Sequence, residues 1–360
     1  MVTPYDHILV TGGAGFVGSS LALSLKEWYP ASRVTAFDNL RRRGSETNLP
    51  RLRAAGVTFV HGDVRAPADL SIGGPDIDLI VECSAEPSVL AGFGDEPSYV
   101  VDTNLGGTVH CLNLARRTTA DVVFLSTSRV YPTDTLNRIA VQEGETRFTI
   151  DPSQELAGVS ERGIDENFPL SGARTLYGAT KLCSELIIAE YSAMYGLRTI
   201  VNRCGVIAGP RQMGKVEQGV FALWVAKHHF KQPLSYIGWG GEGKQVRDML
   251  HIDDLAGLID IQLRDFARLA GATFNVGGGT ASSLSLRETT ELCRQITGNT
   301  VSIRQEEGNR PGDIRLYITD NERVQASTGW SPRQTPVDVL ESIYQWIRAD
   351  EDSLRHLWTA

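Results

Sequence analysis

Tyr177 and Lys181 stand four residues apart in the segment YGATK, a spacing that places both side chains on one face of a helix. An unperturbed phenol titrates near roughly pH 10. A neighbouring ammonium favours the phenolate, so the pair could act as a base that takes a proton from an alcohol. Thr127 lies in the strand-end sequence STS and could donate or accept a hydrogen bond between that phenol and a substrate. Alone, the tyrosine–lysine spacing is common by chance, so its meaning depends on the other motifs.

A glycine-rich segment with the pattern G-x-x-G-x-x-G runs from Gly12 to Gly18. Glycine at such a turn lets backbone N–H groups approach a pyrophosphate, and the start of the following helix attracts the anion. Asp38 ends the next apolar segment about 20 residues later, where a carboxylate suits the adenosine ribose. Asp63 ends the third segment and could accept a hydrogen bond from the adenine amino group. These features together predict a dinucleotide site rather than a glycine-rich surface turn.

The choice between NAD and NADP depends on the residues that follow the second strand. Asp38 favours NAD, because a carboxylate repels the 2′-phosphate of NADP. Arg41, Arg42 and Arg43 could instead hold that phosphate, or they could form a solvated basic turn. We predict NAD, with NADP as the alternative.

Short apolar segments alternate with helical patterns in the first half of the chain. The predicted strands are 7–11, 33–38, 57–63, 78–84, 120–128 and 197–204, and the predicted helices are 16–28, 98–117 and 177–195. This alternation indicates an α/β fold with a Rossmann-type doubly wound parallel sheet. Because ligands bind at the carboxyl edge of such sheets, we expect the glycine turn and the strand-end hydroxyls to share one site.

The domain organisation is predicted from where this rhythm stops. Residues 132–176 are rich in Pro, Gly, Ser and charge, and they form a connection long enough to suggest a function. We expect residues 1–204, including this loop, to form an NAD-binding Rossmann domain. Residues 205–360 should form mainly a smaller, discontinuous α/β lobe that binds substrate, with about 240–278 returning to the first domain.

Composition excludes several classes of protein. The 360 residues suffice for about two domains. The formal net charge of −8 disfavours nucleic-acid binding, which depends on neutralising phosphates. The five cysteines have neither C-x-x-C spacing nor a histidine at zinc-ligand spacing, so we expect buried, reduced thiols and no metal site. We see no secretory signal pattern and no apolar run long enough for a membrane span, and we expect a cytoplasmic protein.

Five motifs together resemble the extended short-chain dehydrogenase/reductase superfamily, specifically nucleotide-sugar epimerases and dehydratases. They are GGAGFVG at 12–18, DNL at 38–40, DV at 63–64, STSRVY at 126–131 and YGATK at 177–181. The resemblance implies a homodimer and a tightly held NAD that takes a hydride from a sugar alcohol and returns it. It assigns catalysis to Thr127, Tyr177 and Lys181. It assigns the cofactor site to the last two together with Gly12, Gly15, Phe16, Val17, Gly18, Asp38, Asn39, Asp63, Val64, Ser84, Ala85 and Asn104.

The residues after the strand-end hydroxyls narrow the class. Dehydratases of this superfamily carry an acidic residue there, because elimination needs another carboxyl group, whereas this chain has Ser128 and Arg129. Longer segments, above all 243–255 and 274–288, resemble the CDP-paratose (CDP-tyvelose) 2-epimerase subgroup. That resemblance implies oxidation at C2 of a CDP-linked hexose, hydride return to the opposite face, and no net redox change.

Two departures from the pattern leave the sugar open. Pro132 replaces the glycine of the usual V-Y-G, and Glu82-Cys83-Ser84-Ala85 replaces the usual H-L-A-A or H-L-A-G. The alternatives are therefore a 4-epimerase or another redox-neutral isomerase, a net dehydrogenase with exchanging cofactor, and a non-catalytic NAD-binding module. The presence of the complete catalytic set disfavours the last of these.

The resemblance also implies handles for the substrate. Arg247 and Arg310 match positions that hold the diphosphate, a role that suits the planar guanidinium, which can bind two phosphate oxygens at once. Arg147, inside the long connection, could reach the sugar or could form a surface ion pair. The remaining predicted substrate residues are Ser128, Arg211, Gln212 and Gln218.

Overall fold

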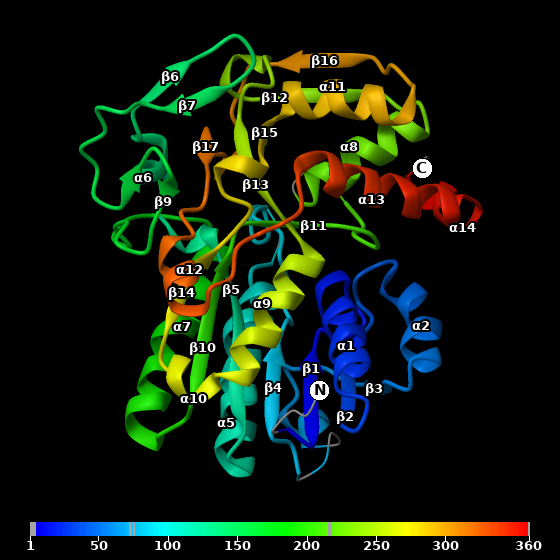
Figure 1. The fold of residues 1–360 in the computed structure, drawn as a ribbon, viewed down its shortest axis with the longest axis vertical. Helices are drawn as coiled ribbons and strands as arrows, with labels where there is room; N and C mark the ends of the chain where they lie inside the picture. Colours follow the sequence, from blue (N-terminus) through cyan, green and yellow to red (C-terminus); the bar gives the residue numbers. More distant parts are fainter. Residues whose placement is uncertain (1–4, 72–73, 75, 95, 215–217, 359–360) are drawn as a thin grey trace.

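The computed structural model describes residues 5–71, 74, 76–94, 96–214 and 218–358. A seven-stranded parallel sheet lies at its centre, with the strand order β14-β10-β5-β4-β1-β2-β3 (Figure 1). This sheet confirms the predicted doubly wound α/β architecture. Its strands are β1 (His7–Thr11), β2 (Arg33–Asp38), β3 (Thr58–His61), β4 (Leu79–Glu82), β5 (Asp121–Thr127), β10 (Thr199–Cys204) and β14 (Thr273–Val276).

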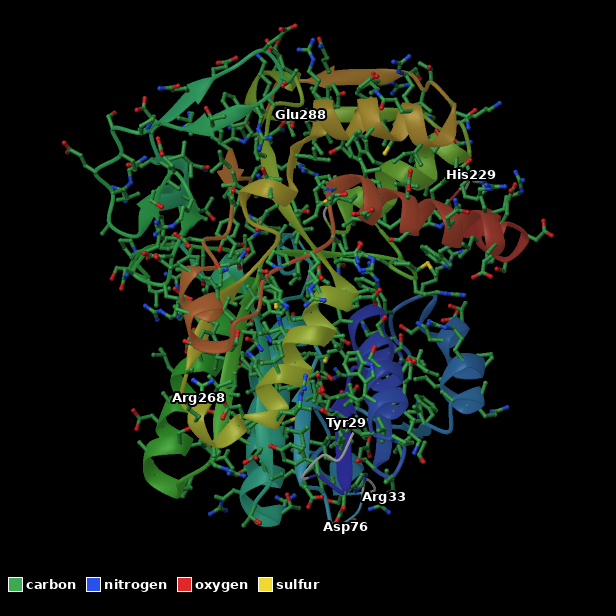
Figure 2. All side chains as sticks on the ribbon, in the orientation of Figure 1. Tyr29, Arg33, Asp76, His229, Arg268 and Glu288 are labelled. Carbon is green, nitrogen blue, oxygen red and sulfur yellow. The ribbon has the colours of Figure 1, made fainter. Side chains whose placement is uncertain are left out.

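Helices cover both faces of this sheet. On one face α1 (Phe16–Trp28) packs beside α9 (Ile252–Arg264), and the Tyr29 hydroxyl after α1 donates a hydrogen bond to Asp260 of α9 (Figure 2). On the other face α5 (Gly107–Thr118) packs beside α7 (Leu176–Tyr195). The strands β1, β4, β5 and β10 are buried on both faces, as a sheet covered on two sides requires, whereas the edge strand β3 is partly exposed.

Several shorter helices also pack near the central sheet. A π-helical turn, Asp102–Gly106, joins α4 (Ser98–Val101) to α5, so the predicted helix at 98–117 is continuous but contains a wide turn. The other short helices near the sheet are α2 (Leu49–Ala54), α3 (Pro67–Leu70), α10 (Phe266–Leu269) and α12 (Glu322–Thr328).

A second unit packs above the carboxyl edge of the sheet (Figure 1). Its sheet joins β11 (Val206–Ala208), β13 (Val246–His251), β15 (Ser283–Ser285) and β17 (Leu316–Tyr317), and a separate parallel pair joins β12 (Leu234–Ile237) and β16 (Ile303–Glu306). Three helices surround a separate apolar core that includes Trp224 and Trp346. They are α8 (Val220–His229), α11 (Leu286–Thr297) and α13 (Pro336–Ala349), and α14 (Glu351–Trp358) follows them.

The chain crosses between the two units more often than the sequence predicts. Within the range 240–278, α9 and β14 pack on the central sheet, whereas β13 belongs to the second sheet. A further segment also returns, because Val324 of α12 and Trp330 lie in the core of the central sheet. Sequence patterns could not separate these cases, since strands of both sheets are equally apolar.

Residues 132–176 are less irregular than predicted. They contain α6 (Thr133–Asn137), the antiparallel pair β6 (Val141–Glu143) with β7 (Phe148–Ile150), and the pair β8 (Val159–Ser160) with β9 (Gly163–Ile164). Strands of two or three residues are too short to show a period in the sequence.

The structure also bears on the expected burial of the cysteines and on the expected lack of a membrane-spanning segment. All five cysteines are unpaired, but Cys183 is exposed and Cys83 is half-buried, so only three are the buried fillers that the sequence suggested. Among the described residues, no helix combines the length and the apolar character that crossing a bilayer requires.

Candidate active site

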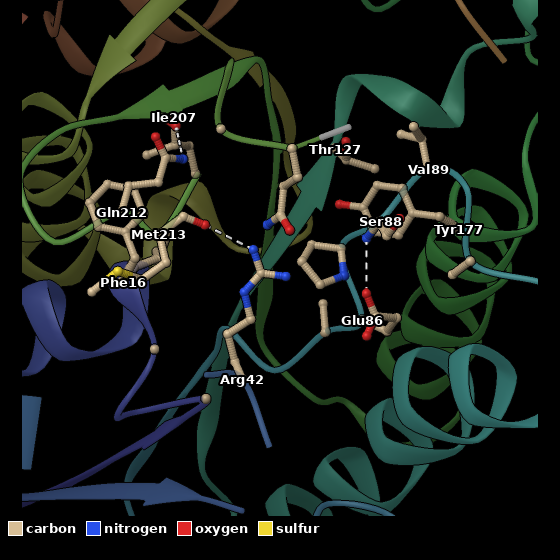
Figure 3. A pocket seen from close by; sticks show the side chains of 18 of the residues that line it. Phe16, Arg42, Glu86, Ser88, Val89, Thr127, Tyr177, Ile207, Gln212 and Met213 are labelled. Carbon is tan, nitrogen blue, oxygen red and sulfur yellow. Dashed lines mark hydrogen bonds between the residues drawn. The ribbon is translucent and has the colours of Figure 1, made fainter. Parts of the chain in front are cut away.

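A cavity of about 1020 Å³ opens at the carboxyl edge of the central sheet, below the second unit (Figure 3). The ends of β1, β2, β4 and β5 and the start of α7 line one side, and loops of the second unit line the other. This is where open α/β sheets bind ligands. The predicted site residues that line it are Gly12, Gly15, Phe16, Val17, Gly18, Asp38, Asn39, Val64, Ser84, Ala85, Thr127, Ser128, Tyr177, Lys181, Arg211, Gln212, Gln218, Arg247 and Arg310.

The glycine turn has the shape that a dinucleotide pyrophosphate requires. Gly15 caps α1, and neither a side-chain cap nor an acidic side chain occupies the first turn of that helix. The helix start therefore keeps its N–H groups and its positive dipole end for an anion. A Cβ atom at Gly18 would lie 2.1 Å from the carbonyl oxygen of Gly12, so only glycine lets the helix pack this closely on the turn. These residues fit a bound NAD.

Gly18→Ala is expected to weaken NAD binding and to destabilise the fold by about 1–3 kcal/mol, because the added methyl group meets backbone atoms that cannot move aside. Calorimetric titration with NAD and urea unfolding would measure the two effects. Gly257→Ala in α9 is the matched control, since no other part of the protein lies within 4 Å of its Cβ position. If Gly18→Ala bound NAD with wild-type affinity, the proposed need for close packing of α1 on the backbone of Gly12 would be contradicted.

Asp38 is held at the edge of the cavity by the backbone. Its carboxylate accepts hydrogen bonds from Leu40 N at 2.7 Å and from Ala14 N at 3.1 Å, and burial raises its pKa. Two of the nearby arginines are engaged elsewhere. Arg41 stacks on the Tyr99 ring at 3.8 Å, and Arg42 donates to the carbonyl oxygen of Met213 (Figure 3). This arrangement favours NAD over NADP.

Asp63 and Asn104 do not line the cavity, although the sequence analysis assigned both to the cofactor site. Arg65 forms an ion pair with Asp63 at 2.7 Å and holds the pKa of that carboxyl well below its usual range. Asn104 exchanges hydrogen bonds with the backbone of Glu86 and donates to the Thr180 hydroxyl at 3.2 Å. It therefore fastens the loop that follows β4 to α7.

Thr127 and Tyr177 come together at the end of β5 (Figure 3). The Thr127 hydroxyl lies close enough to the phenol to lower its pKa, and Thr127 accepts a hydrogen bond from Arg129 N at 3.2 Å. A Cβ atom at Gly178 would lie 2.0 Å from the carbonyl oxygen of Arg129. The start of α7 is thus packed directly on the turn after β5, and this contact fixes the phenol beside the hydroxyl.

The pKa of Tyr177 departs from the expectation that Lys181 would lower it. Burial is the largest influence and raises the pKa of the phenol. The nearby Thr127 hydroxyl and the positive charge of Arg129 oppose that effect. The Lys181 ammonium instead lies 3.8 Å from the centre of the Phe124 ring, because its side chain runs down toward the sheet. The sequence did not reveal that Arg129 places a positive charge beside the phenol. There, Arg129 served only to show that no acidic residue follows the strand-end hydroxyls.

Three arginines lie close together in the lining of the cavity, namely Arg129, Arg247 and Arg310. Arg247 donates to the carbonyl oxygen of Ile314 at 2.6 Å and lies 3.6 Å from Asp313. Burial, together with the charges of Arg129 and Arg310, lowers the pKa of Arg247 to about 9. A buried cluster with excess positive charge is stabilised when an anion enters, as a diphosphate would.

Among the other predicted substrate residues, Arg147 lies off the cavity. It donates to the Ser283 hydroxyl at 2.6 Å and lies 3.5 Å from Glu288 of α11, which is labelled near the top of the second unit in Figure 2. Arg211 lines the cavity, but it is paired with Asp350 at 2.5 Å. Gln212 donates to Ile207 O at 2.9 Å, and its carbonyl oxygen is buried without a partner in the described structure.

Comparisons with known proteins agree with this geometry. The model of the NAD dependent epimerase/dehydratase family matches residues 8–277. A CDP-paratose 2-epimerase of Salmonella typhi is 30% identical over 358 residues, which cover 94% of this chain and 98% of that protein. The crystal structure of dTDP-glucose 4,6-dehydratase from Bacillus anthracis str. Ames in complex with NAD has a TM-score of 0.74 and 28% identity, covering 98% and 99% of the two chains. That of UDP-glucuronic acid 4-epimerase from Bacillus cereus, in complex with UDP-glucuronic acid and NAD, has a TM-score of 0.77 and 22% identity, covering 95% and 99%.

Proposed function

The chain belongs to the NAD-dependent epimerase/dehydratase family, and we propose that within it the protein is a 2-epimerase of a CDP-linked hexose. The observation that carries this proposal is the turn after β5. There Thr127, which lies beside the Tyr177 phenol, is followed by Ser128 and Arg129 rather than by an acid. These groups suit oxidation and reduction of an alcohol, and they lack the extra carboxyl group that elimination uses. The relative named a CDP-paratose 2-epimerase supports both the reacting carbon and the nucleotide.

The residues of the cavity divide the work of this reaction. The glycine turn and Asp38 would hold NAD, which accepts a hydride from the sugar carbon and gives one back. Tyr177 takes the hydroxyl proton as the carbinol is oxidised and returns it when the ketone is reduced. Thr127, placed beside the phenol, orients the sugar hydroxyl. Arg247 and Arg310 would hold the diphosphate while the keto sugar presents its opposite face.

A 4-epimerase acting on a different nucleotide sugar is the second candidate. The arginine cluster is equally compatible with this second candidate. Guanidinium groups bind the diphosphate of any nucleotide sugar and distinguish neither the base nor the carbon that reacts. Relatives named UDP-glucose 4-epimerase match the chain at 26% identity.

A panel of CDP-, UDP-, dTDP- and GDP-hexoses incubated in D₂O, with proton NMR as the readout, tests the proposal. We expect inversion at C2 of a CDP-hexose without deuterium at that carbon. The hydride that NAD would return is the one taken from the sugar, so it does not exchange with solvent. Inversion at C4 would establish the second candidate instead. Deuterium at the inverted carbon, or net accumulation of reduced nicotinamide, would contradict both.

We also propose a cytoplasmic homodimer that pairs through α5 and α7. Unpaired thiols are typical of reducing compartments, and all five cysteines are unpaired. Leu186 and Met194 of α7 expose 62% and 67% of their surface, which is unusual for large apolar side chains and would be covered by a second copy.

A further inference from the structure

Glu82 is a buried carboxyl group at the end of β4 that the proposed mechanism does not use. Only 1% of the residue is exposed. One carboxyl oxygen accepts a hydrogen bond of 2.5 Å from the Thr108 hydroxyl of α5, and the other is buried without a hydrogen-bond partner in the described structure. Leaving a buried acceptor unpaired is costly unless another charge compensates it.

Strand register places this carboxyl group beside Lys181. Glu82 pairs with Phe124 of β5 in parallel register, so the two side chains stand next to each other on the same face of the sheet. The Lys181 ammonium lies 3.8 Å from the centre of that Phe124 ring. The Thr108 hydroxyl that binds Glu82 also contacts Ser184, one turn after Lys181 on α7, at 3.3 Å. The carboxyl group and the ammonium therefore lie in one buried region between β4, β5, α5 and α7, farther apart than the 4 Å of a direct ion pair.

The other ionisable groups around Lys181 are either engaged or uncharged. Glu185 of α7 accepts from the Arg203 guanidinium of β10 at 2.7 Å, so a second cation already balances it. The neighbouring thiols are Cys83 after β4, Cys111 on α5 and Cys204 at the end of β10. Burial raises the pKa of all three, which keeps them neutral. Glu82 is thus the one carboxyl group near Lys181, among the described residues, without a second basic partner. Burial raises the pKa of Glu82 as well, and the positive charge of Lys181 is the largest influence that opposes this rise.

We propose that Glu82 is the internal counter-ion of Lys181, a positioning residue that keeps the buried ammonium charged at the floor of the cofactor cavity. This inference rests on the proposed place of Lys181 at the cofactor. Burial lowers the pKa of Lys181, and the negative charge of Glu82 is the largest influence that raises it again. The charge of Glu82 thus favours the ammonium form of Lys181, the form that can donate hydrogen bonds to cofactor hydroxyls.

Glu82→Gln tests the inference, because it removes the charge and keeps the shape. Without the carboxylate, the pKa of Lys181 falls further, so the ammonium is lost at a lower pH. We expect bound NAD to be released faster as pH rises through the pKa of Lys181. In Glu82→Gln this acceleration should begin about one to two pH units lower than in the wild type. Exchange of bound NAD for fluorescent 1,N⁶-ethenoadenine dinucleotide, followed between about pH 6 and pH 10, measures it without any sugar substrate.

Companion variants separate charge from packing. Glu82→Asp keeps the charge and should retain the wild-type pH profile, whereas Glu82→Met, a second neutral replacement, should repeat the shift of Glu82→Gln. Lys181→Met should release NAD quickly and independently of pH. Glu190→Gln makes the same substitution on the exposed side of α7 and should change nothing.

The outcomes distinguish this inference from the function on which it rests. A Glu82→Gln profile that coincides with the wild type, alongside a flat Lys181→Met profile, overturns the counter-ion role and leaves the place of Lys181 intact. A Lys181→Met protein that keeps the wild-type profile overturns both. The sugar assignment is decided separately by the NMR panel, because NAD exchange requires no nucleotide sugar.

Discussion

Tyr177→Phe is expected to lower turnover by about 10²–10⁴-fold while the protein keeps its NAD, because the substitution removes the proton acceptor and leaves the cavity walls unchanged. Burial raises the pKa of this phenol, and Thr127 and Arg129 only partly offset that effect. The phenolate is the form that accepts a proton, so wild-type turnover should increase with pH up to the pKa of Tyr177 in the complex. The NMR assay on the accepted CDP-hexose measures turnover, and absorbance of the denatured protein's supernatant measures retained NAD.

The control for this prediction is Tyr195→Phe, which removes a hydroxyl from an exposed tyrosine at the end of the same helix. Its turnover should stay within about two-fold of the wild type. If Tyr177→Phe turned over at the wild-type rate, the general base would have to be another group, and the proposed division of roles in the cavity would fail.

Glu185→Leu is expected to destabilise the protein by about 3–5 kcal/mol, the largest stability effect that the structure implies. Glu185 and Arg203 are only 7% and 8% exposed, and removing the carboxylate leaves a buried guanidinium without its counter-ion. The Ser126 hydroxyl at the end of β5 would lose its acceptor as well. Urea unfolding followed by circular dichroism would measure the change in the free energy of unfolding.

The double variant Glu185→Leu/Arg203→Met should recover most of that loss, because replacing both charges by apolar groups leaves no buried charge unpaired, and only the Ser126 hydroxyl still lacks its acceptor. The exposed pair of Glu291 and Arg294 on α11 is the control, and Glu291→Gln should change stability by less than about 1 kcal/mol. A Glu185→Leu protein as stable as the wild type would show that the pair is not isolated from water.

The cofactor half of the site could be predicted from the sequence because its parts are local. The glycine turn and Asp38 sit on consecutive strand ends, and a parallel sheet brings consecutive strand ends together at one edge. The spacing of Tyr177 and Lys181 similarly determined that they share one helix. Local spacing was also enough to predict the strands β1 and β2 and the helix α1 within about one residue.

The sequence alone did not determine what each side chain faces. Tyr177 and Lys181 share a helix face, but the phenol meets Thr127 and Arg129 while the ammonium descends toward Phe124 and Glu82. The substrate side depended on packing even more, since Arg247, Arg310 and Arg129 come from segments far apart in the chain. Arg147 was directed away from the cavity by its contacts with β15 and α11.

What the sequence by itself determined is therefore the Rossmann framework, the glycine turn after β1 and the shared helix of Tyr177 and Lys181, because each depends on spacings within one or two neighbouring elements. Only the tertiary structure decided which charges surround the phenol and the ammonium, and which arginines meet at the diphosphate position. Electrostatic influence depends on distance and burial. Both are set by packing between segments more than a hundred residues apart, such as the turn after β5 and the loop at Arg310–Asp313.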